Sequence, residues 1–179
     1  MSENEAVAIR GFLAAPGTGS EKIQRLGAWY AAEHERLYRF AYLLTRDQES
    51  AEDLVQDAFI KIYRKGAGVD DQGLSAYARR TVVNLLRSGL RRRSVERRVL
   101  QQLSAERPPS DPDRDSTVDV RRALLTLSVR DRACLALRYY EGFSDKEIAA
   151  VLGVTEVAAK KRAQRAHQRL RALMSQEES

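Results

Sequence analysis

The sequence of 179 residues has one cysteine, Cys134, and two histidines, His34 and His167. A single thiol excludes an intrachain disulfide and any zinc site built from several cysteines. Neither histidine has a nearby cluster of cysteines or carboxylates at metal-site or catalytic-triad spacing, and there is no glycine-rich phosphate loop. We therefore expect no catalytic residue, no metal site, no cofactor and no small-molecule substrate.

Long hydrophobic runs are also missing. No apolar stretch is long enough to span a bilayer, and the segment Ala6–Ala15 is too short for a signal peptide and contains Arg10. Cys134 lies in an apolar helical run, where a small core residue is the simplest interpretation. We expect no membrane insertion and a cytoplasmic location.

The residues that are abundant carry charge. Asp, Glu, Lys and Arg make up 31% of the sequence, the formal net charge is +6 and the isoelectric point is about 9.7. A basic chain of this kind is suited to a polyanionic partner such as nucleic acid.

The hydrophobic pattern is helical and divides into two parts. No useful strand-type alternation and no internal repeat occur, so the expected fold class is all-α, with two small helical domains joined by a flexible linker. The linker contains Pro108, Pro109 and Pro112 among Asp and Ser residues, a composition that cannot form a core. The expected boundaries are a tail at 1–20, a first domain at 21–98, the linker at 99–117, a second domain at 118–174 and a tail at 175–179.

The second domain contains the sequence pattern of a helix-turn-helix. Ser144 and Glu147 have the spacing of a capping box before a short helix, Asp145–Leu152, and Gly153 is suited to its left-handed end. Thr155 can cap the next helix. One side of that helix is an apolar stripe, formed by Ala159, Ala163, Ala166 and Leu170. The opposite side is cationic and rich in amides, as phosphate and base contacts require. The alternative is a solvated charged face on an ordinary helix.

The first domain is predicted to be helical from Glu21 to about Arg98, with breaks near Thr45–Asp47 and Lys65–Gly73, and two of its helices carry informative residues. Over Ser50–Arg64 the apolar residues follow helical spacing, and the polar face contains one apolar residue, Ile60. Taken alone, Ile60 is more simply an ordinary surface residue than a protein-docking site. The second of these helices, from about Leu74 to Arg93, carries Tyr77 and Asn84, which suits stacking on exposed bases and hydrogen bonding to them. It is strongly cationic through a cluster of arginines, Arg79, Arg80, Arg87, Arg91, Arg92 and Arg93. We favour nucleic-acid contact there over a solvated basic face.

At this point the residues match a family. In order and spacing, three motifs resemble those of the extracytoplasmic-function group of bacterial sigma factors. They are AEDLVQDAFIKIYR at Ala51–Arg64, the run Ala76–Asn84, and LRYYEGFSDKEIAAVLGV at Leu137–Val154 followed by the basic helix. The resemblance covers about 27–98 and 118–174, and the second motif looks like an actinobacterial variant.

The resemblance implies a factor that makes core RNA polymerase specific for promoters. It implies core-polymerase binding, at the β′ clamp helices, by Asp53, Gln56, Asp57 and Ile60. It implies −10 DNA binding by Tyr77, Arg80, Asn84, Arg87 and Arg91. It implies −35 DNA binding by Thr155, Lys160, Lys161, Arg162, Gln164 and Arg165. The β flap, promoter DNA and an anti-sigma factor are the other implied partners.

Several positions depart from the family pattern. Tyr77 replaces the more usual tryptophan, Ser128 stands where a proline is common, and Val157 replaces a common glycine. Ala159 and Ala163 stand where larger aliphatic residues are usual, so we expect the last helix to pack closely on its partner. The alternative function is a stand-alone helix-turn-helix regulator, which explains the second domain equally well but leaves the first domain unexplained.

Overall fold

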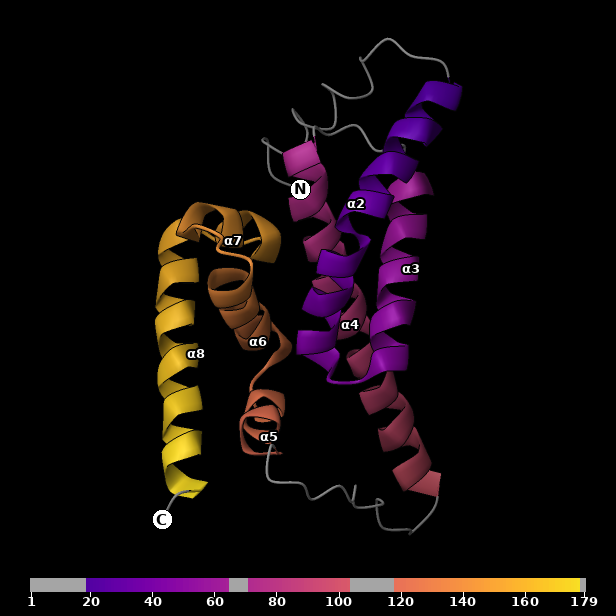
Figure 1. The fold of residues 1–179 in the computed structure, drawn as a ribbon. Coiled ribbons are helices and arrows are strands. Elements are labelled where there is room, and N and C mark those ends of the chain that lie inside the picture. Colours follow the sequence, from indigo (N-terminus) through magenta and orange to yellow (C-terminus); the bar gives the residue numbers. More distant parts are fainter. Residues whose placement is uncertain (1–18, 65–70, 104–117, 178–179) are drawn as a thin grey trace.

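The computed structural model describes residues 19–64, 71–103 and 118–177, and all of the regular structure in these ranges is helical (Figure 1). The predicted all-α fold is therefore confirmed. Most of the predicted tail 1–20 and the predicted loop Lys65–Gly73 lie outside the described residues, as does residue range 104–117 of the predicted linker.

Three long helices form the first module: α2 (Gly19–Thr45), α3 (Gln48–Arg64) and α4 (Asp71–Leu103). The predicted break between the first two is present, and Asp47 accepts a hydrogen bond from the Ser50 backbone N–H at 2.8 Å, as an N-terminal cap does. Helix α4, which was predicted to run from about Leu74 to Arg93, is longer than expected at both ends. It continues past Arg93 to Leu103, so it enters the predicted linker range.

The core of the first module follows the predicted apolar positions. In α3, the side chains of Ala51, Val55, Ala58 and Ile62 are fully buried. They pack against an apolar face of α2 that includes Phe40. This packing leaves the remaining side of α3 facing solvent, and that side carries the predicted docking residues.

The second module contains α5 (Val118–Thr126), α6 (Val129–Leu135), a π-helical turn η1 (Ala136–Tyr140), α7 (Asp145–Leu152) and α8 (Glu156–Glu177). The apolar stripe predicted for α8 is confirmed, because Ala159, Ala163 and Ala166 are buried. Cys134 is also buried, and its Sγ lies 3.7 Å from the Ala159 carbonyl oxygen. Helices α6 and α8 therefore pack closely, as the small residues on α8 predict.

The two modules pack directly against each other. Figure 1 shows α6 and α7 beside the α2–α4 module, with α8 on the far side of the second module. One continuous cluster of buried apolar residues includes Leu37 and Phe40 of α2, Val82 of α4 and Leu137 and Ile148 of the second module. The sequence predicted two domains on a linker, but it did not predict this shared core.

Candidate nucleic-acid and protein interfaces

The helix-turn-helix has the local geometry that its sequence predicts. Ser144 caps α7: its Oγ accepts from the Glu147 N–H at 3.3 Å, and the Glu147 carboxylate accepts from the Ser144 N–H at 2.8 Å. Gly153 ends α7 with φ of 64°, in the left-handed region that glycine adopts at low cost. Thr155 Oγ1 then accepts from the Ala158 N–H at 3.2 Å, which caps α8. These caps fix the angle at which α8 leaves the turn.

The capping box gives a testable stability prediction. We expect Ser144→Ala to lower the free energy of unfolding by about 1 kcal/mol at neutral pH. Hydrogen bonds from Ser144 lower the pKa of the Glu147 carboxyl below its ordinary 4.5, so this stabilisation is present above pH 4.5 and is lost as pH falls through the folded-state value. The difference between variant and wild type should therefore shrink on acidification in urea titrations, and a difference that grows would contradict the assignment.

The outward face of α8 presents the predicted −35 residues. Lys160, Lys161, Gln164 and Arg165 are all exposed, and they lie in the N-terminal half of the helix, which is the half that enters the major groove in this motif. Arg165 Nε also donates to the Lys161 carbonyl at 3.3 Å. The structure thus brings these four side chains together on one accessible face.

Arg162 differs from its neighbours on α8. Its guanidinium donates to Asp131 Oδ1 at 2.8 Å, and its side chain is 29% exposed. Asp131 also accepts from Ser128 Oγ at 2.7 Å, and Ser128 caps α6 by accepting from the Asp131 N–H. Ser128, where the family often has proline, therefore helps to tie α6 to α8, and Arg162 is held in the same network.

The predicted docking residues lie on the solvent side of α3. Asp53, Gln56 and Asp57 are exposed, and Ile60 is 43% exposed among them. Tyr63, which the sequence analysis did not single out, is 50% exposed one turn beyond Ile60. The i, i+3 spacing was the available indication of this residue. Together they form an acidic face with two adjacent apolar side chains.

The predicted −10 residues on α4 fall into two groups. Asn84, Arg87 and Arg91 are exposed, whereas Tyr77 and Arg80 are half-buried. The Arg80 guanidinium lies against the helix-turn-helix: a Cβ added at Gly153 would be 3.3 Å from Arg80 Nη2. The five side chains therefore do not form one open surface in this arrangement.

Arg79 corrects the interpretation of the arginine cluster. The sequence placed it with the exposed basic residues of this helix, but it is 1% exposed and paired with Glu33 and Glu141. Its fixed fork of N–H donors is suited to such pairing, and burial without partners would be very costly. It belongs to the contact between the modules.

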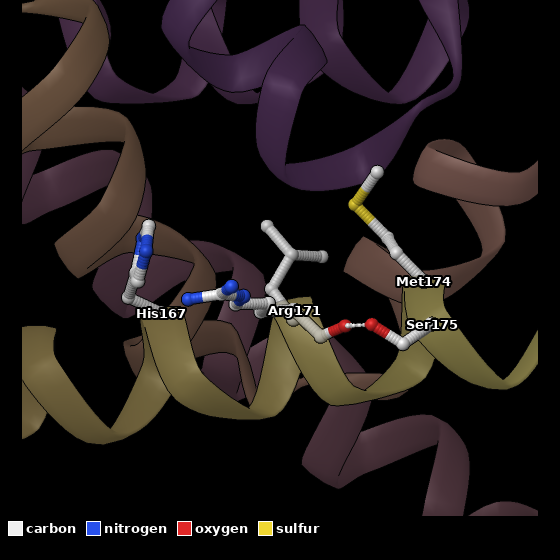
Figure 2. Close-up of a pocket in the computed structure, with 5 residues that line it drawn as sticks. His167, Arg171, Met174 and Ser175 are labelled. Carbon is white, nitrogen blue, oxygen red and sulfur yellow. Dashed lines mark hydrogen bonds between the residues drawn. The ribbon is translucent and has the colours of Figure 1, made fainter.

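An apolar groove of about 430 Å³ is lined mostly by the second module, and Leu43 of α2 in the first module also lines it. It is lined by Leu43, Leu124, Arg132, Leu135, Ala136, Tyr139, Tyr140, His167 and Leu170. Farther along α8, a second hollow is bordered by His167, Arg171, Met174 and Ser175, where the Ser175 hydroxyl donates to the Arg171 carbonyl at 3.0 Å (Figure 2). The groove offers apolar surface to another protein.

Within the described ranges, no group of three or more metal-ligating side chains occurs. No helix there is long and apolar enough to cross a membrane. His167 lies beside Tyr139, with its Nδ1 3.3 Å from the Tyr139 hydroxyl.

Comparison with protein families finds a match in each module. Residues 29–96 match the family described as Sigma-70 region 2, and residues 117–170 match Sigma-70, region 4. The first match contains α3 and most of α4, and the second contains the helix-turn-helix. The boundaries fall close to those of the two modules.

Individual relatives give the same result. The chain is 32% identical over 153 residues to the ECF RNA polymerase sigma factor SigE of Mycolicibacterium smegmatis, covering 81% of this chain and 60% of that protein. It is 34% identical over 149 residues to the ECF RNA polymerase sigma factor SigM of Mycobacterium tuberculosis, covering 81% and 74%. A solved structure of the sigma factor RpoE in complex with the anti-sigma factor NepR from Bartonella quintana is 29% identical. Its TM-score is 0.63, with 85% of this chain and 95% of that chain covered.

Proposed function

Because the chain belongs to the extracytoplasmic-function group of RNA polymerase sigma factors, we propose that it binds core RNA polymerase and directs it to promoters. It recognises the −35 and −10 elements and supports promoter opening and the initiation of transcription. The family is not enzymatic, so the polymerase supplies the chemistry. The proposed place of action is the cytoplasm, with the polymerase and the DNA.

This proposal rests on one observation: α8 and α3 present two separate exposed faces with different chemistry. The capped turn at Gly153 presents Lys160 and Arg165 on an exposed helix face that suits the major groove. A separate face of α3 offers carboxylates and apolar side chains, which suits a protein partner and not DNA. A stand-alone regulator needs only the first face.

The individual contacts extend the proposal. Asp53, Gln56, Asp57 and Ile60, with Tyr63 beside them, dock on the β′ clamp helices. Tyr77, Arg80, Asn84, Arg87 and Arg91 contact the −10 element. Thr155, Lys160, Lys161, Gln164 and Arg165 contact the −35 element. Arg162 is proposed as a phosphate contact on the family pattern, although its pairing with Asp131 also gives it a structural role.

Two further protein partners are proposed, and the first of them uses the apolar groove. We propose that the β flap docks there, because the groove, which is lined mostly by α5, α6, η1 and α8, is apolar and open to an apolar side chain. An anti-sigma protein is proposed as the regulator, since the similar RpoE structure contains the anti-sigma factor NepR.

Run-off transcription tests the function directly. Core RNA polymerase from a mycobacterium is mixed with this chain and a library of promoter fragments, and transcripts are sequenced. We expect initiation at a defined subset of fragments only when both proteins are present. Binding of isolated DNA by the chain alone, with no polymerase-dependent transcript, would favour the stand-alone regulator instead.

A further inference from the structure

A charged cluster is buried where the two modules meet. The Glu141 carboxylate, in the loop before α7, has no exposed surface. It accepts from Arg79 Nη2 of α4 at 2.9 and 2.8 Å, and from Arg36 Nη2 of α2 at 3.1 Å. Arg79 also donates to Glu33 Oε2 at 3.1 Å. One carboxylate of the second module thus binds two arginines of the first.

The backbone before α7 places Glu141 in this position. The π-helical turn η1 ends with the Glu141 N–H donating to the Ala136 carbonyl at 3.1 Å. Gly142 follows with φ of 72°, which turns the chain away from the helix axis. The Phe143 ring then lies under the Arg79 guanidinium, 5.5 Å from its Cζ. Three successive residues therefore shape the contact with the first module.

Other contacts across the same junction act in opposite directions. Arg132 of α6 is buried and donates to the Leu44 carbonyl of α2, which joins the modules a second time. Against this, burial lowers the pKa of the Arg130 guanidinium, and the charges of Arg87 and Arg162 lower it further. Arg87 is on α4, so cations of the two modules repel each other here. The closed arrangement is held by specific contacts and opposed by charge.

This arrangement conflicts with simultaneous recognition of two promoter elements. The names −35 and −10 give the positions of the two elements in base pairs, so the elements lie about 25 base pairs apart. At about 3.4 Å per pair, this is roughly 85 Å along B-DNA. Here the guanidinium of Arg80, a proposed −10 residue, lies close to Gly153, just before the proposed −35 helix. Helix α8 has 22 residues and is only about 33 Å long, so it cannot bridge that distance.

We propose that Glu141 is a latch that holds the free chain closed, and that the modules must separate before both promoter elements are bound. The proposal rests on the proposed function, which supplies the two elements. A buried ion pair is suited to such a latch because its contribution to stability is modest while its geometry is specific. Contacts with polymerase can therefore replace it. The −35 face of α8 stays exposed in the closed form, so the latch blocks combined recognition and not access to α8.

Distance measurement between spin labels tests the latch in the full chain. Labels are attached at Ala31→Cys on α2 and Ala172→Cys on α8, both exposed positions. Cys134 is left in place, because burial shields its thiol and raises its pKa. We expect a single distance, that of the closed arrangement, in the otherwise wild-type chain, and a longer distance in opened molecules. Glu141→Gln should lower the ratio of closed to open molecules at least about tenfold, because it removes one of the two carboxylates paired with the buried Arg79 guanidinium.

The matched control is Glu52→Gln, which removes an exposed carboxylate charge on α3 and should leave the distance unchanged. Arg36→Gln, a change at a mostly exposed side chain, should open the chain to a smaller extent. The proposal would be overturned if Glu141→Gln and Arg36→Gln both kept the label distance of the closed chain. It would also be overturned if the control variant opened as much as they do. These measurements need no polymerase, so their failure is separate from a failure of run-off transcription. Adding core polymerase to the labelled wild type should give the open distance, and a bound but closed chain would also overturn the latch.

Discussion

Replacing Asp53 and Asp57 together with lysine is expected to weaken binding of the chain to core RNA polymerase by about a thousandfold or more. Both carboxylates are exposed on α3, on either side of Gln56 and next to Ile60. Losing a charge contact at the centre of a protein interface costs about 2–5 kcal/mol, and reversal adds repulsion. The measurement is a fluorescence titration of labelled chain with core polymerase, without DNA.

Two controls make this result specific to α3. Glu35→Lys on α2 makes the same change of charge as either single lysine substitution, at another exposed position, and should bind normally. Ile60→Ser removes apolar surface without changing charge, so its loss of affinity should persist at high salt, while the effect of the lysine variants should weaken there. Circular dichroism should show that all variants remain folded. Unchanged affinity in the double lysine variant would place the docking surface elsewhere.

The parts of the fold that could be predicted are those set by local sequence. Ser144, Glu147 and Gly153 lie within ten residues of one another, and each acts through its nearest backbone groups, so the turn between α7 and α8 follows from the sequence alone. The buried side of α3 was equally accessible, because its apolar residues repeat with the helix period.

The contact between the modules could not be predicted in this way. Arg79 is in a run of arginines, where exposure is the usual outcome. Its partners Glu33 and Glu141 are 46 and 62 residues away in sequence, so no local pattern connects the three. The same is true of Arg80, whose position depends on Gly153. The apolar faces of α3 and α8 were identified correctly, while the residues of α4 that meet the second module required the structure.

Replacing Lys160 or Arg165 with alanine is expected to weaken binding of the holoenzyme to its promoter by about 1–3 kcal/mol each, or roughly 5- to 150-fold. Both side chains are exposed near the N-terminal end of α8, where the helix can enter the major groove. Arg171→Ala is the matched control, because it removes an exposed arginine from the same helix beyond the region expected to reach the groove. The measurement is promoter binding on a fragment recovered from the run-off library.

The same variants separate base recognition from phosphate contact. If a side chain contacts a base, its removal should relax the sequence preference at one position of the −35 element. If it contacts a phosphate, affinity should fall evenly for all sequences, and the dependence of binding on salt should decrease by about one ion. Arg162→Ala should behave differently from both, because it breaks the ion pair with Asp131 and should lower thermal stability as well as binding. If neither Lys160→Ala nor Arg165→Ala changes promoter binding or transcription, α8 is not the −35 recognition helix.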